Sequence, residues 1–441
     1  MKLSGWGQYP VMEARTHSPR GVDALRELVL HEPSLIARGN GRAYGDSAIN
    51  TSATIGTHYL NRMLAFDANS GQLVAESGVL LGDIIAAFLP RGWFPMVTPG
   101  TKFITLGGAI AADVHGKNHH KDGSFRACVD WIDVMGPDGE IHRCSRQDDA
   151  TLFDYTLGGM GLTGIILRAS LRLRRVETAW IRQKTIATPN LKSAMVAFET
   201  TQDATYSVAW IDCFGTGGNL GRSLVMLGEH ATPNDLSTKQ TQTPFWVKPK
   251  RKLIVPVHFP AFILNRLTVR SFNALYYRAG KRKTGERLVD WDNYFYPLDT
   301  IYGWNRIYGR KGFVQFQCAL PLNRSEDGLT SLLTAIAKAG LGSFLAVLKR
   351  LGRQDSAFSF PMEGYTLALD FPVTAKTFAL LERLDRITID HGGRFYLAKD
   401  GRMSAATLRA SDPRVGDFQA YREALGLTNR FRSAQAERLA L

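Results

Sequence analysis

The sequence contains little cysteine and no long apolar run. Its four cysteines are spread over 441 residues, at Cys128, Cys144, Cys213 and Cys318, and none belongs to a CxxC pair. Structural zinc and a disulfide framework are therefore not expected, and this usage fits a reducing cytoplasm. No uninterrupted apolar run reaches the roughly 18 residues that a membrane span needs. The opening residues, MKLSGWGQYP, carry Gly, Gln and Pro where a secretory signal would have its apolar core.

The motifs of several enzyme classes are also missing. A dinucleotide fingerprint needs G-x-G-x-x-G between a strand and a helix. The match that begins at Gly39 has Tyr44 at the third glycine position, and the match that begins at Gly215 has Leu220 there. A phosphate-binding G-x-x-x-x-G-K-[ST] loop and a G-x-S-x-G nucleophile elbow are absent as well. A Rossmann dehydrogenase, a P-loop enzyme and an α/β-hydrolase therefore have no support.

Acidic residues are absent from one long window, residues 236–285. The window contains eleven Lys or Arg and no Asp or Glu, in a chain whose net charge is +14. Aromatic residues such as Trp246, Phe272 and Tyr276 are interleaved with the basic ones. This combination suits an anionic membrane surface or a lipid phosphate, and a solvated basic loop is the simpler alternative. No helix-turn-helix, zinc-finger or RNP pattern supports nucleic acid as the partner.

The remaining composition is that of a globular protein, with 44% hydrophobic and 21% charged residues. Residues 1–176 alternate short strand-like runs with turns. Helical spacing appears at 80–89, and a hairpin is predicted at 129–144 around Gly-Pro-Asp-Gly. Alternation at 165–174 predicts a strand.

The pattern of predicted elements changes after Val176. Strands are predicted at 206–212, 313–319 and 365–371, and amphipathic helices at 329–339 and 375–390. The tail from Asp412 onward is expected to be helical and basic. We therefore expect a glycine-rich N-terminal domain, a larger domain of sheet and helix, and a C-terminal return.

Two glycine-rich segments, 37–47 and 98–116, stand out in the first domain. The second begins with a Pro-Gly turn and a β-prone run, Phe103 to Thr105, and then crosses Gly107 and Gly108. Glycine-rich loops present backbone N–H groups that can hold a pyrophosphate, so both segments suit a large cofactor with phosphates and a planar ring. The alternative is that these glycines only make tight turns.

Histidines follow the second segment, at His115, His119 and His120. A metal site is not expected here, because His119 and His120 are adjacent and no acidic residue shares a helical face with them.

These motifs together resemble a known family. The order ARGNGRAYGD, GVLLGDI, TPGTKFITLGGAIAADVHGKNHH and GGMGLTGII resembles the FAD-binding domain of the vanillyl-alcohol-oxidase, or PCMH-type, flavoprotein superfamily. Later motifs, among them FLAVLK, LDFP and FYLAKD, are similar to the flavoprotein oxidoreductase components of decaprenylphosphoryl-β-D-ribose 2′-epimerases. The resemblance implies an α+β fold: a PCMH-type FAD-binding domain at 1–176, a substrate domain at 177–392 on an antiparallel sheet flanked by helices, and a return at 393–441.

The resemblance also implies where FAD lies. Residues that would contact the cofactor are Ala37, Arg38, Gly39, Asn40, Gly41, Arg42, Ala43, Tyr44, Gly45, Asp46, Ser47, Gly100, Thr105, Leu106, Gly107, Gly108, Ala112, Asp113, Val114, His115, Ile166 and Tyr396. Many members have a histidine, covalently joined to the flavin, where this chain has Arg42. Arginine cannot form that bond, so non-covalent FAD is expected.

Substrate residues follow from the same resemblance. Lys399 is the leading catalytic candidate, as a base or as a cation beside the developing alkoxide, and His115 and Tyr44 are the others. Lys399 as a charge partner of the flavin, and His115 as a positioning residue, are the alternatives. Substrate-lining residues would be Lys117, Trp210, Phe295, Gln315, Gln317, Lys349, Thr366 and Ala368. Ala368 stands where mycobacterial members have a cysteine, which predicts insensitivity to inhibitors that capture that thiol.

The implied activity is FAD-dependent oxidation of the 2′-hydroxyl of a polyprenylphosphoryl-β-D-ribose to the 2′-keto intermediate. This is the first half of an epimerisation to an arabinose donor for the cell envelope, and an NAD(P)H-dependent short-chain reductase would complete it. We expect a cytoplasmic protein in peripheral contact with the inner face of an anionic membrane. The alternatives are a soluble sugar or aldonolactone oxidase of the same superfamily and a basic binding protein without enzymatic activity.

Overall fold

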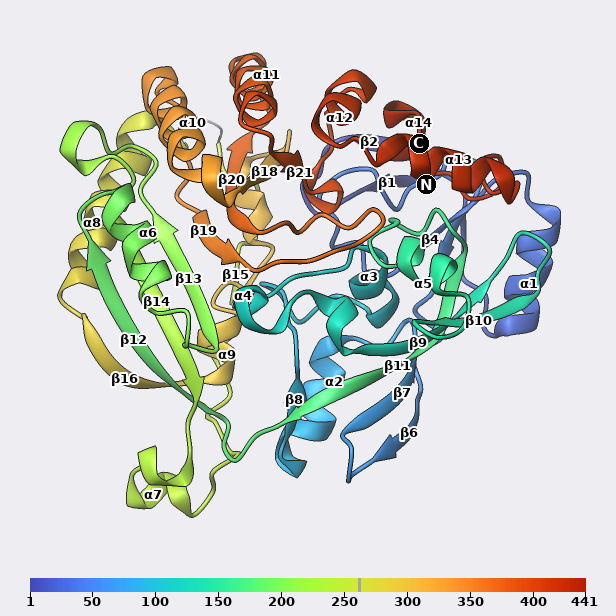
Figure 1. The fold of residues 1–441 in the computed structure, drawn as a ribbon, viewed down its shortest axis with the longest axis horizontal. Coiled ribbons are helices and arrows are strands. Elements are labelled where there is room, and N and C mark those ends of the chain that lie inside the picture. The colour runs from blue at the N-terminus through green and yellow to red at the C-terminus, as the bar shows by residue number, and fades with distance from the viewer. Residues whose placement is uncertain (261–262) are drawn as a thin grey trace.

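The computed structural model describes residues 1–260 and 263–441 and divides into two halves that lie side by side (Figure 1). The N-terminal half is built on a six-stranded sheet with the order β10-β9-β11-β7-β6, in which β8 also pairs with β11. Its strands are β6 (Met63–Asp67), β7 (Gln72–Glu76), β8 (Trp93–Pro95), β9 (Val129–Met135), β10 (Ile141–Ser145) and β11 (Ile165–Arg175). The predicted hairpin is confirmed, since Ile141 pairs with Met135 across the Gly-Pro-Asp-Gly turn.

Short helices and a small parallel sheet complete this half. The helices are α1 (Val22–His31), α2 (Leu81–Phe88), α3 (Leu106–Ala111), α4 (His119–Asp122) and α5 (Ala150–Thr156). The small sheet has the order β3-β5-β4, with β3 (Thr16–His17), β4 (Ile36–Arg38) and β5 (Thr54–Gly56), and β1 (Lys2–Ser4) pairs with β2 (Val11–Glu13). The glycine-rich segment 37–47 therefore leaves the end of β4.

The second half is an eight-stranded antiparallel sheet with the order β16-β12-β14-β13-β19-β20-β18-β21. Its strands are β12 (Trp180–Thr188), β13 (Tyr206–Ile211), β14 (Ser223–His230), β16 (Gly285–Asp290), β18 (Phe313–Pro321), β19 (Ala346–Leu351), β20 (Gly364–Pro372) and β21 (Arg394–Phe395). Outside the sheet lie β15 (Leu253–Ile254), β17 (Ile301–Tyr302), α7 (Thr238–Thr241) and α9 (Trp291–Phe295).

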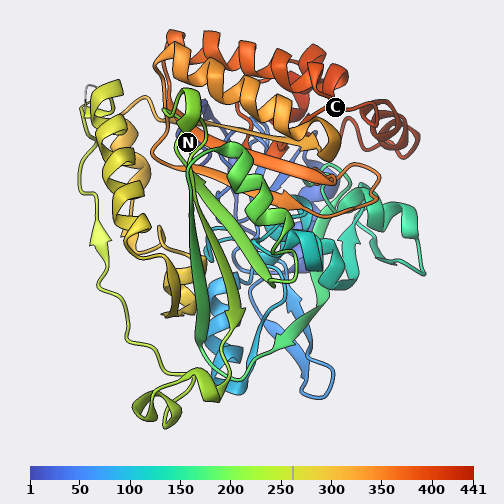
Figure 2. The same cartoon turned by 60° about the vertical axis from the view of Figure 1, so that its left-hand side comes forward.

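The two faces of this sheet have different covers (Figure 2). One face packs against α6 (Leu191–Glu199), α10 (Ser325–Ala339) and α11 (Ala375–Asp390) in the largest hydrophobic core of the described residues. The helix α8 (Arg266–Lys281) lies on the other face, where the Tyr276 ring is 4.8 Å from the Trp210 ring. Alternate residues of each strand point to opposite faces, and on the face that carries α8 the Gln317 side chain reaches His115 of the N-terminal half.

The C-terminal segment returns to the N-terminal half, and the two termini lie near each other (Figure 1). Its helices are α12 (Ala405–Ser411), α13 (Val415–Ala424) and α14 (Ala434–Leu439). The Leu35 N–H donates to the Arg430 carbonyl at 2.8 Å, and the Arg438 guanidinium bridges Asp46 at 2.7 Å and Asp400 at 2.9 Å. Asp46, in the first glycine-rich segment, is thus fixed from the end of the chain.

Two sequence expectations need correction. The β-prone run Phe103 to Thr105 is not a strand: Thr105 makes only an isolated bridge with Leu80 and then caps α3, its side-chain oxygen accepting from the Gly108 N–H at 3.2 Å. Local capping by threonine outweighs its strand preference here. The basic window 236–285 is not one solvated loop, because α8 occupies sixteen of its residues; residues 261–262 of the window lie outside the described residues.

Candidate active site

Strand alternation gathers six of the eight predicted substrate residues on the inner face of the large sheet; Lys117 and Phe295 lie outside the sheet. Trp210 pairs with Val347, Lys349 with Thr366, and Gln317 with Ala368. Directly paired residues point to the same face of an antiparallel sheet. Their sequence neighbours Ala209, Leu348 and Leu367 belong to the core on the other face. Four strands therefore present one continuous wall, which is largely polar, to the N-terminal half.

Asp370 is a member of this wall that the sequence analysis does not single out. It pairs with Gln315, whose amide donates to its carboxylate, and its exposed fraction is 1%. Burial raises the pKa of Asp370 to about 7, against the lowering effects of the Gln315 hydrogen bond and of Lys399. The period-two pattern of Thr366, Ala368 and Asp370 places it on the substrate face, and that pattern is the signal that could have found it.

Lys399 projects toward the same wall from the C-terminal return. Its Nζ lies 3.7 Å from the centre of the Tyr44 ring. The pKa of Lys399 is lowered to about 7, chiefly by burial; Asp370 acts in the opposite direction, and Lys349 adds a smaller lowering effect. Burial and Asp370 hold the pKa of Tyr44 well above its usual value. Near neutral pH a large fraction of Lys399 is therefore an unprotonated amine, beside a phenol that keeps its proton.

His115 lies opposite the wall and contacts it directly. The Gln317 side-chain nitrogen is 3.2 Å from His115 Nε2 and 3.2 Å from the Thr366 hydroxyl. Burial, and then Lys349, hold the pKa of His115 well below its usual value, so the imidazole is neutral. An amide that donates to Nε2 places the imidazole proton on Nδ1, and Nδ1 has no partner among the described residues. His115 is thus arranged to donate a hydrogen bond to a bound ligand.

Lys117 closes one end of the site. Its Nζ donates to the Tyr294 carbonyl and lies 4.1 Å from the Tyr294 ring centre and 5.8 Å from that of Phe295. Burial lowers the pKa of Lys117 to about 7, with a further contribution from Lys349. Phe295 is 1% exposed and stacks on Phe94 at 5.2 Å, so it supports Lys117 from behind.

The two glycine-rich segments contact each other beside this site. A Cβ atom at Gly39 would lie 2.2 Å from the Thr105 hydroxyl, and one at Gly107 would lie 2.8 Å from the Ser77 Cβ. The Gly107 N–H donates to the Ser77 carbonyl at 2.7 Å, and Asn40 donates to the Phe103 carbonyl at 2.8 Å. Only residues without a side chain permit this approach, which brings the backbone of Gly39 against Thr105 and that of Gly107 against Ser77.

Comparisons with known proteins agree with this geometry. Residues 18–145 match the FAD binding domain family. Decaprenylphosphoryl-β-D-ribose oxidase of Mycolicibacterium smegmatis is 34% identical to the chain, and the similarity covers 100% of this chain and 97% of that protein. The chain belongs to the vanillyl-alcohol-oxidase, or PCMH-type, family of FAD-linked oxidoreductases.

Other relatives differ in how much of the chain they match. An uncharacterised protein of Streptomyces coelicolor is 32% identical over 80% of this chain and 97% of its own length. L-gulonolactone oxidase of Mus musculus is 25% identical over only 39% of this chain and 40% of its own length. Full-length similarity is thus found with the ribose oxidase and not with the lactone oxidase.

The residues of the flavoprotein fit an FAD molecule. Two buried polar atoms near the two glycine-rich segments, Arg42 Nε and Ser77 Oγ, have no partner among the described residues. An unpaired buried polar atom costs about 1–3 kcal/mol, which a bound cofactor would relieve. No acidic side chain of the described residues takes part in the close approach of Gly39 to Thr105 or of Gly107 to Ser77, and uncharged glycine-rich backbone of this kind suits a diphosphate.

Arg42 is held between two aromatic rings. Its guanidinium carbon lies 4.3 Å from the Trp6 ring centre and 5.2 Å from the Phe103 ring centre. Cation–π attraction to both rings fixes the guanidinium. Burial lowers the pKa of Arg42, and Asp299 acts against that effect.

Other residues predicted at the cofactor fix the end of the second glycine-rich segment. Asp113, which has a φ of 37°, accepts hydrogen bonds from the Ser124 hydroxyl and the Arg126 N–H, both at 2.8 Å. The Tyr396 hydroxyl donates to the Ala112 carbonyl at 2.9 Å. Leu106, Val114 and Ile166 are buried in the hydrophobic core of the N-terminal half, whereas nothing lies within 4 Å of a Cβ at Gly100.

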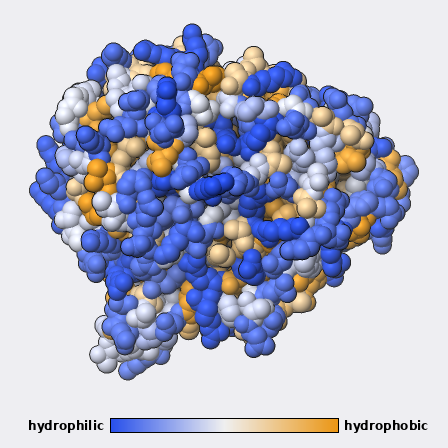
Figure 3. Space-filling view, viewed as in Figure 1, coloured by the Kyte–Doolittle hydropathy of each residue, from blue (hydrophilic) through white to orange (hydrophobic). Residues whose placement is uncertain are grey.

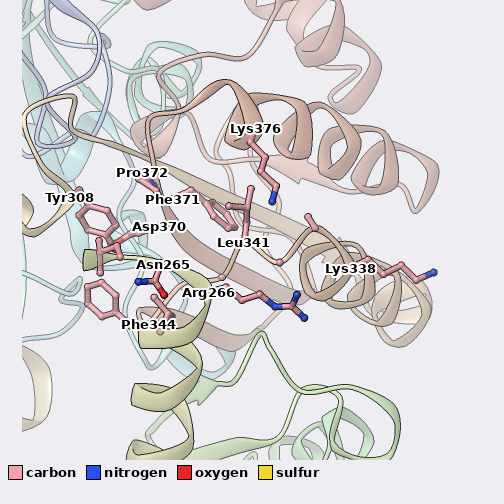
Figure 4. Close-up of a pocket in the computed structure, with 15 residues that line it drawn as sticks. Asn265, Arg266, Tyr308, Lys338, Leu341, Phe344, Asp370, Phe371, Pro372 and Lys376 are labelled. Carbon is pink, nitrogen blue, oxygen red and sulfur yellow. The ribbon is translucent and has the colours of Figure 1, made fainter. Parts of the chain in front are cut away.

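A cavity of about 420 Å³ opens beside Asp370. It lies between the start of α8, the segment that follows α10 and the end of β20 (Figure 4). Tyr308, Phe344 and Asp370 form its inner end, and Arg266 and Lys376 lie farther out. The Tyr308 ring is fixed there, since it stacks on Phe344 at 5.8 Å. The cavity thus joins the polar wall to the surface around α8.

Proposed function

We propose that this flavoprotein oxidises the 2′-hydroxyl of a polyprenylphosphoryl-β-D-ribose to the 2′-ketone. The observation that carries the proposal is Lys399, whose pKa of about 7 suits a base, held beside Tyr44 and under the influence of Asp370 at a wall of amides. Full-length similarity to a decaprenylphosphoryl-β-D-ribose oxidase supports the choice of substrate.

The chemistry divides between the cofactor and the protein. FAD, when bound, accepts the hydride from C2 of the ribose. Lys399 in its neutral form takes the proton of the 2′-hydroxyl, and its ammonium is then stabilised by the Asp370 carboxylate. The His115 Nδ1–H donates to a sugar oxygen and so orients the ring, while Gln315 and Gln317 provide further amide contacts on the wall. Tyr44 keeps its proton and supports the ammonium with its ring.

The decisive test is anaerobic reduction of the FAD-loaded protein by farnesylphosphoryl-β-D-ribose. Loss of the yellow flavin absorbance, with formation of one equivalent of ketone, is expected. Farnesylphosphoryl-2-deoxyribose is the matched control, because it lacks the reacting hydroxyl. A fully loaded protein that stays oxidised with the ribose compound would contradict the proposal.

FAD is proposed to be bound without a covalent link, because Arg42 occupies the position at which many members of the family carry the attached histidine. Acid precipitation should release all of the flavin into the supernatant. Flavin that remains with the precipitated protein would show an attachment at another residue.

The ketone is proposed to pass to an NAD(P)H-dependent short-chain reductase, which delivers hydride to the opposite face of C2 and yields an arabinose donor for the cell envelope. A ketone intermediate supports this order, because inversion at C2 needs a second hydride transfer. A mixture of both enzymes with NADPH should convert the ribose compound into the arabinose epimer, whereas the flavoprotein alone should stop at the ketone.

Peripheral contact with the inner face of an anionic membrane is proposed to occur through α8. Leu267 is 75% exposed, Leu275 65% and Phe272 45%, on a helix that also carries exposed Arg270 and Arg278. An amphipathic helix of this kind suits the lipid interface. The face seen in Figure 3 is largely hydrophilic, with hydrophobic groups scattered over it. In the described part of the chain, no helix combines the length and apolar character needed to span a bilayer.

A further inference from the structure

Three lysines converge on the active site with little compensating negative charge. Lys349 and Lys399 approach from the sheet wall and the C-terminal return, and Lys117 approaches from the loop before α4. Lys349 is close enough to lower the pKa of Lys117, of Lys399 and of His115. Asp370 acts on Lys399, but among the described residues no carboxylate raises the pKa of Lys349 or Lys117.

Such an arrangement is costly unless an anion completes it. Burial lowers the pKa of Lys349 to about 8 and that of Lys117 to about 7. Lys349 is therefore mostly charged at neutral pH, although the described part of the wall gives its ammonium no acidic partner. Lys349 and Lys117 are half-buried, so their charge is only partly solvated without a counter-ion, and a charge-assisted hydrogen bond to an anion relieves that cost.

We propose that Lys349, assisted by Lys117, binds the phosphodiester of the lipid-linked substrate while Lys399 acts on its 2′-hydroxyl. The inference rests on the proposed function and names the residues that hold the anionic group, which the oxidation itself does not use. Lys349 stands directly across from Thr366, which shares the Gln317 amide with His115. An anion at Lys349 is thus a close neighbour of the sugar ring that His115 and Gln317 orient.

The chemistry of the substrate favours this position over the rim of the cavity in Figure 4. The phosphodiester is attached to C1, the carbon next to the reacting C2, so its anionic oxygens must lie within a few bonds of the hydroxyl that Lys399 deprotonates. Arg266 and Lys376 line the outer part of the cavity, and Lys338 extends away from the other labelled side chains. These outer cations are therefore placed to meet lipid headgroups, and the inner lysines to meet the phosphodiester.

The proposal also accounts for selectivity. A neutral sugar or lactone would leave the Lys349 ammonium without a partner, whereas a phosphodiester supplies one negative charge. The wall therefore discriminates against water-soluble neutral sugars through charge rather than through ring shape.

The test measures binding of a dead-end ligand to the FAD-loaded protein. Farnesylphosphoryl-2-deoxyribose keeps the phosphodiester but cannot be oxidised at C2, and its methylphosphonate analogue has the same shape without the charge. Wild-type protein should bind the charged ligand about 10- to 100-fold more tightly than the neutral one, as expected for a hydrogen bond to a charged group. Lys349→Met should remove this preference, and Lys349→Arg should restore most of it. Lys192→Met, an exposed lysine of α6 on the other face of the sheet, is the matched control.

Calorimetry at pH 8 in two buffers of different ionisation enthalpy gives an independent readout. The titratable groups that interact with Lys349 are Lys117, Lys399, His115 and His119. A bound anion raises the lowered pKa of the lysines. The protein should therefore take up protons when it binds the charged ligand, and should not do so when it binds the neutral analogue. Lys349→Met should reduce this uptake.

The outcomes separate the inference from the proposed function. Equal preference for the charged ligand in wild type and Lys349→Met, with unchanged proton uptake, would overturn the inference even if farnesylphosphoryl ribose bleaches the flavin. Failure of that compound to bleach a loaded wild-type protein would overturn the proposed function, whatever the binding data show. Flavin absorbance and thermal unfolding of each variant verify that it is folded and loaded.

Discussion

The two walls of the active site are built in opposite ways. The cofactor wall consists of backbone brought close by glycine, as at Gly39 against Thr105 and Gly107 against Ser77. The substrate wall consists of long side chains from strands and from the C-terminal return, with Lys349, Asp370 and Lys399 among them. We expect the first wall to hold a diphosphate whatever the pH, whereas the second depends on groups whose pKa values lie near neutrality. Substitutions in the cofactor wall should therefore reduce flavin content, whereas substitutions in the substrate wall should change the rate of flavin reduction and its dependence on pH.

The largest effect is expected on the substrate wall, from Lys399→Met. Loss of a general base slows proton transfer by roughly 100- to 10,000-fold. Single-turnover flavin reduction by farnesylphosphoryl ribose should slow by this amount, while the flavin remains bound. In wild type the rate should rise with pH through about 7, since the pKa of Lys399 is lowered to about 7 and only its neutral form accepts a proton. A variant that reduces its flavin at the wild-type rate would remove Lys399 from the mechanism.

Gly39→Ala tests the cofactor wall. The added Cβ would meet the Thr105 hydroxyl at 2.2 Å, so the two glycine-rich segments must move apart. Overpacking of this kind costs about 1–3 kcal/mol, and we expect most of the protein to be purified without flavin. Gly416→Ala is the control, because nothing lies within 4 Å of a Cβ at that position. Normal flavin content in Gly39→Ala, at unchanged affinity, would show that the close approach is dispensable.

The two walls also differ in how well the sequence predicts them, because one is made of contiguous glycine-rich backbone and the other of side chains from distant segments. The cofactor wall is encoded locally: RGNGRAYGD and TLGG are contiguous, and their glycines are visible in the sequence. Even there, the helix α3 escapes prediction, because Thr105 serves as a cap and six residues are too few for a period to emerge.

The substrate wall is assembled over long distances. Lys399 contacts Tyr44 from the opposite end of the chain, and no local pattern records that contact. The strands predicted from alternation at 313–319 and 365–371 correspond to β18 and β20. Their pairing register, which places Gln315 opposite Asp370, emerges only in the structure. Alternation can place Asp370 on the correct face, but only the register identifies its partner and hence its role.

Asp370→Asn should have a smaller effect than the loss of Lys399. Asp370 raises the pKa of Lys399 against the effect of burial. Without its charge the pKa of Lys399 should fall by roughly one unit, so more of the amine is neutral at low pH. The acidic limb of the rate profile should therefore move to lower pH, with a modest change in the maximum rate. An unshifted limb would mean that Asp370 does not act on Lys399; flavin content serves as the control for folding.

The smallest effect on turnover is expected from α8, which lies outside both walls. Arg278→Gln removes one exposed charge, and each basic residue near an anionic surface contributes about 1 kcal/mol, so the affinity for phosphatidylserine vesicles should fall about fivefold. Leu275→Ser should also weaken vesicle binding, because its side chain is 65% exposed and would lose its contact with lipid. Neither change should alter flavin reduction by a short-chain substrate in detergent-free solution, since both side chains are exposed to solvent.

The control for this surface is a basic residue of the other half. Arg175, at the end of β11, is also exposed, and Arg175→Gln removes the same charge at a position away from α8. It should leave vesicle binding close to that of wild type, which separates a local contact from a general effect of net charge. If both α8 variants bind vesicles as wild type does, membrane contact must be made by another surface, and the cavity beside Asp370 would no longer open toward lipid.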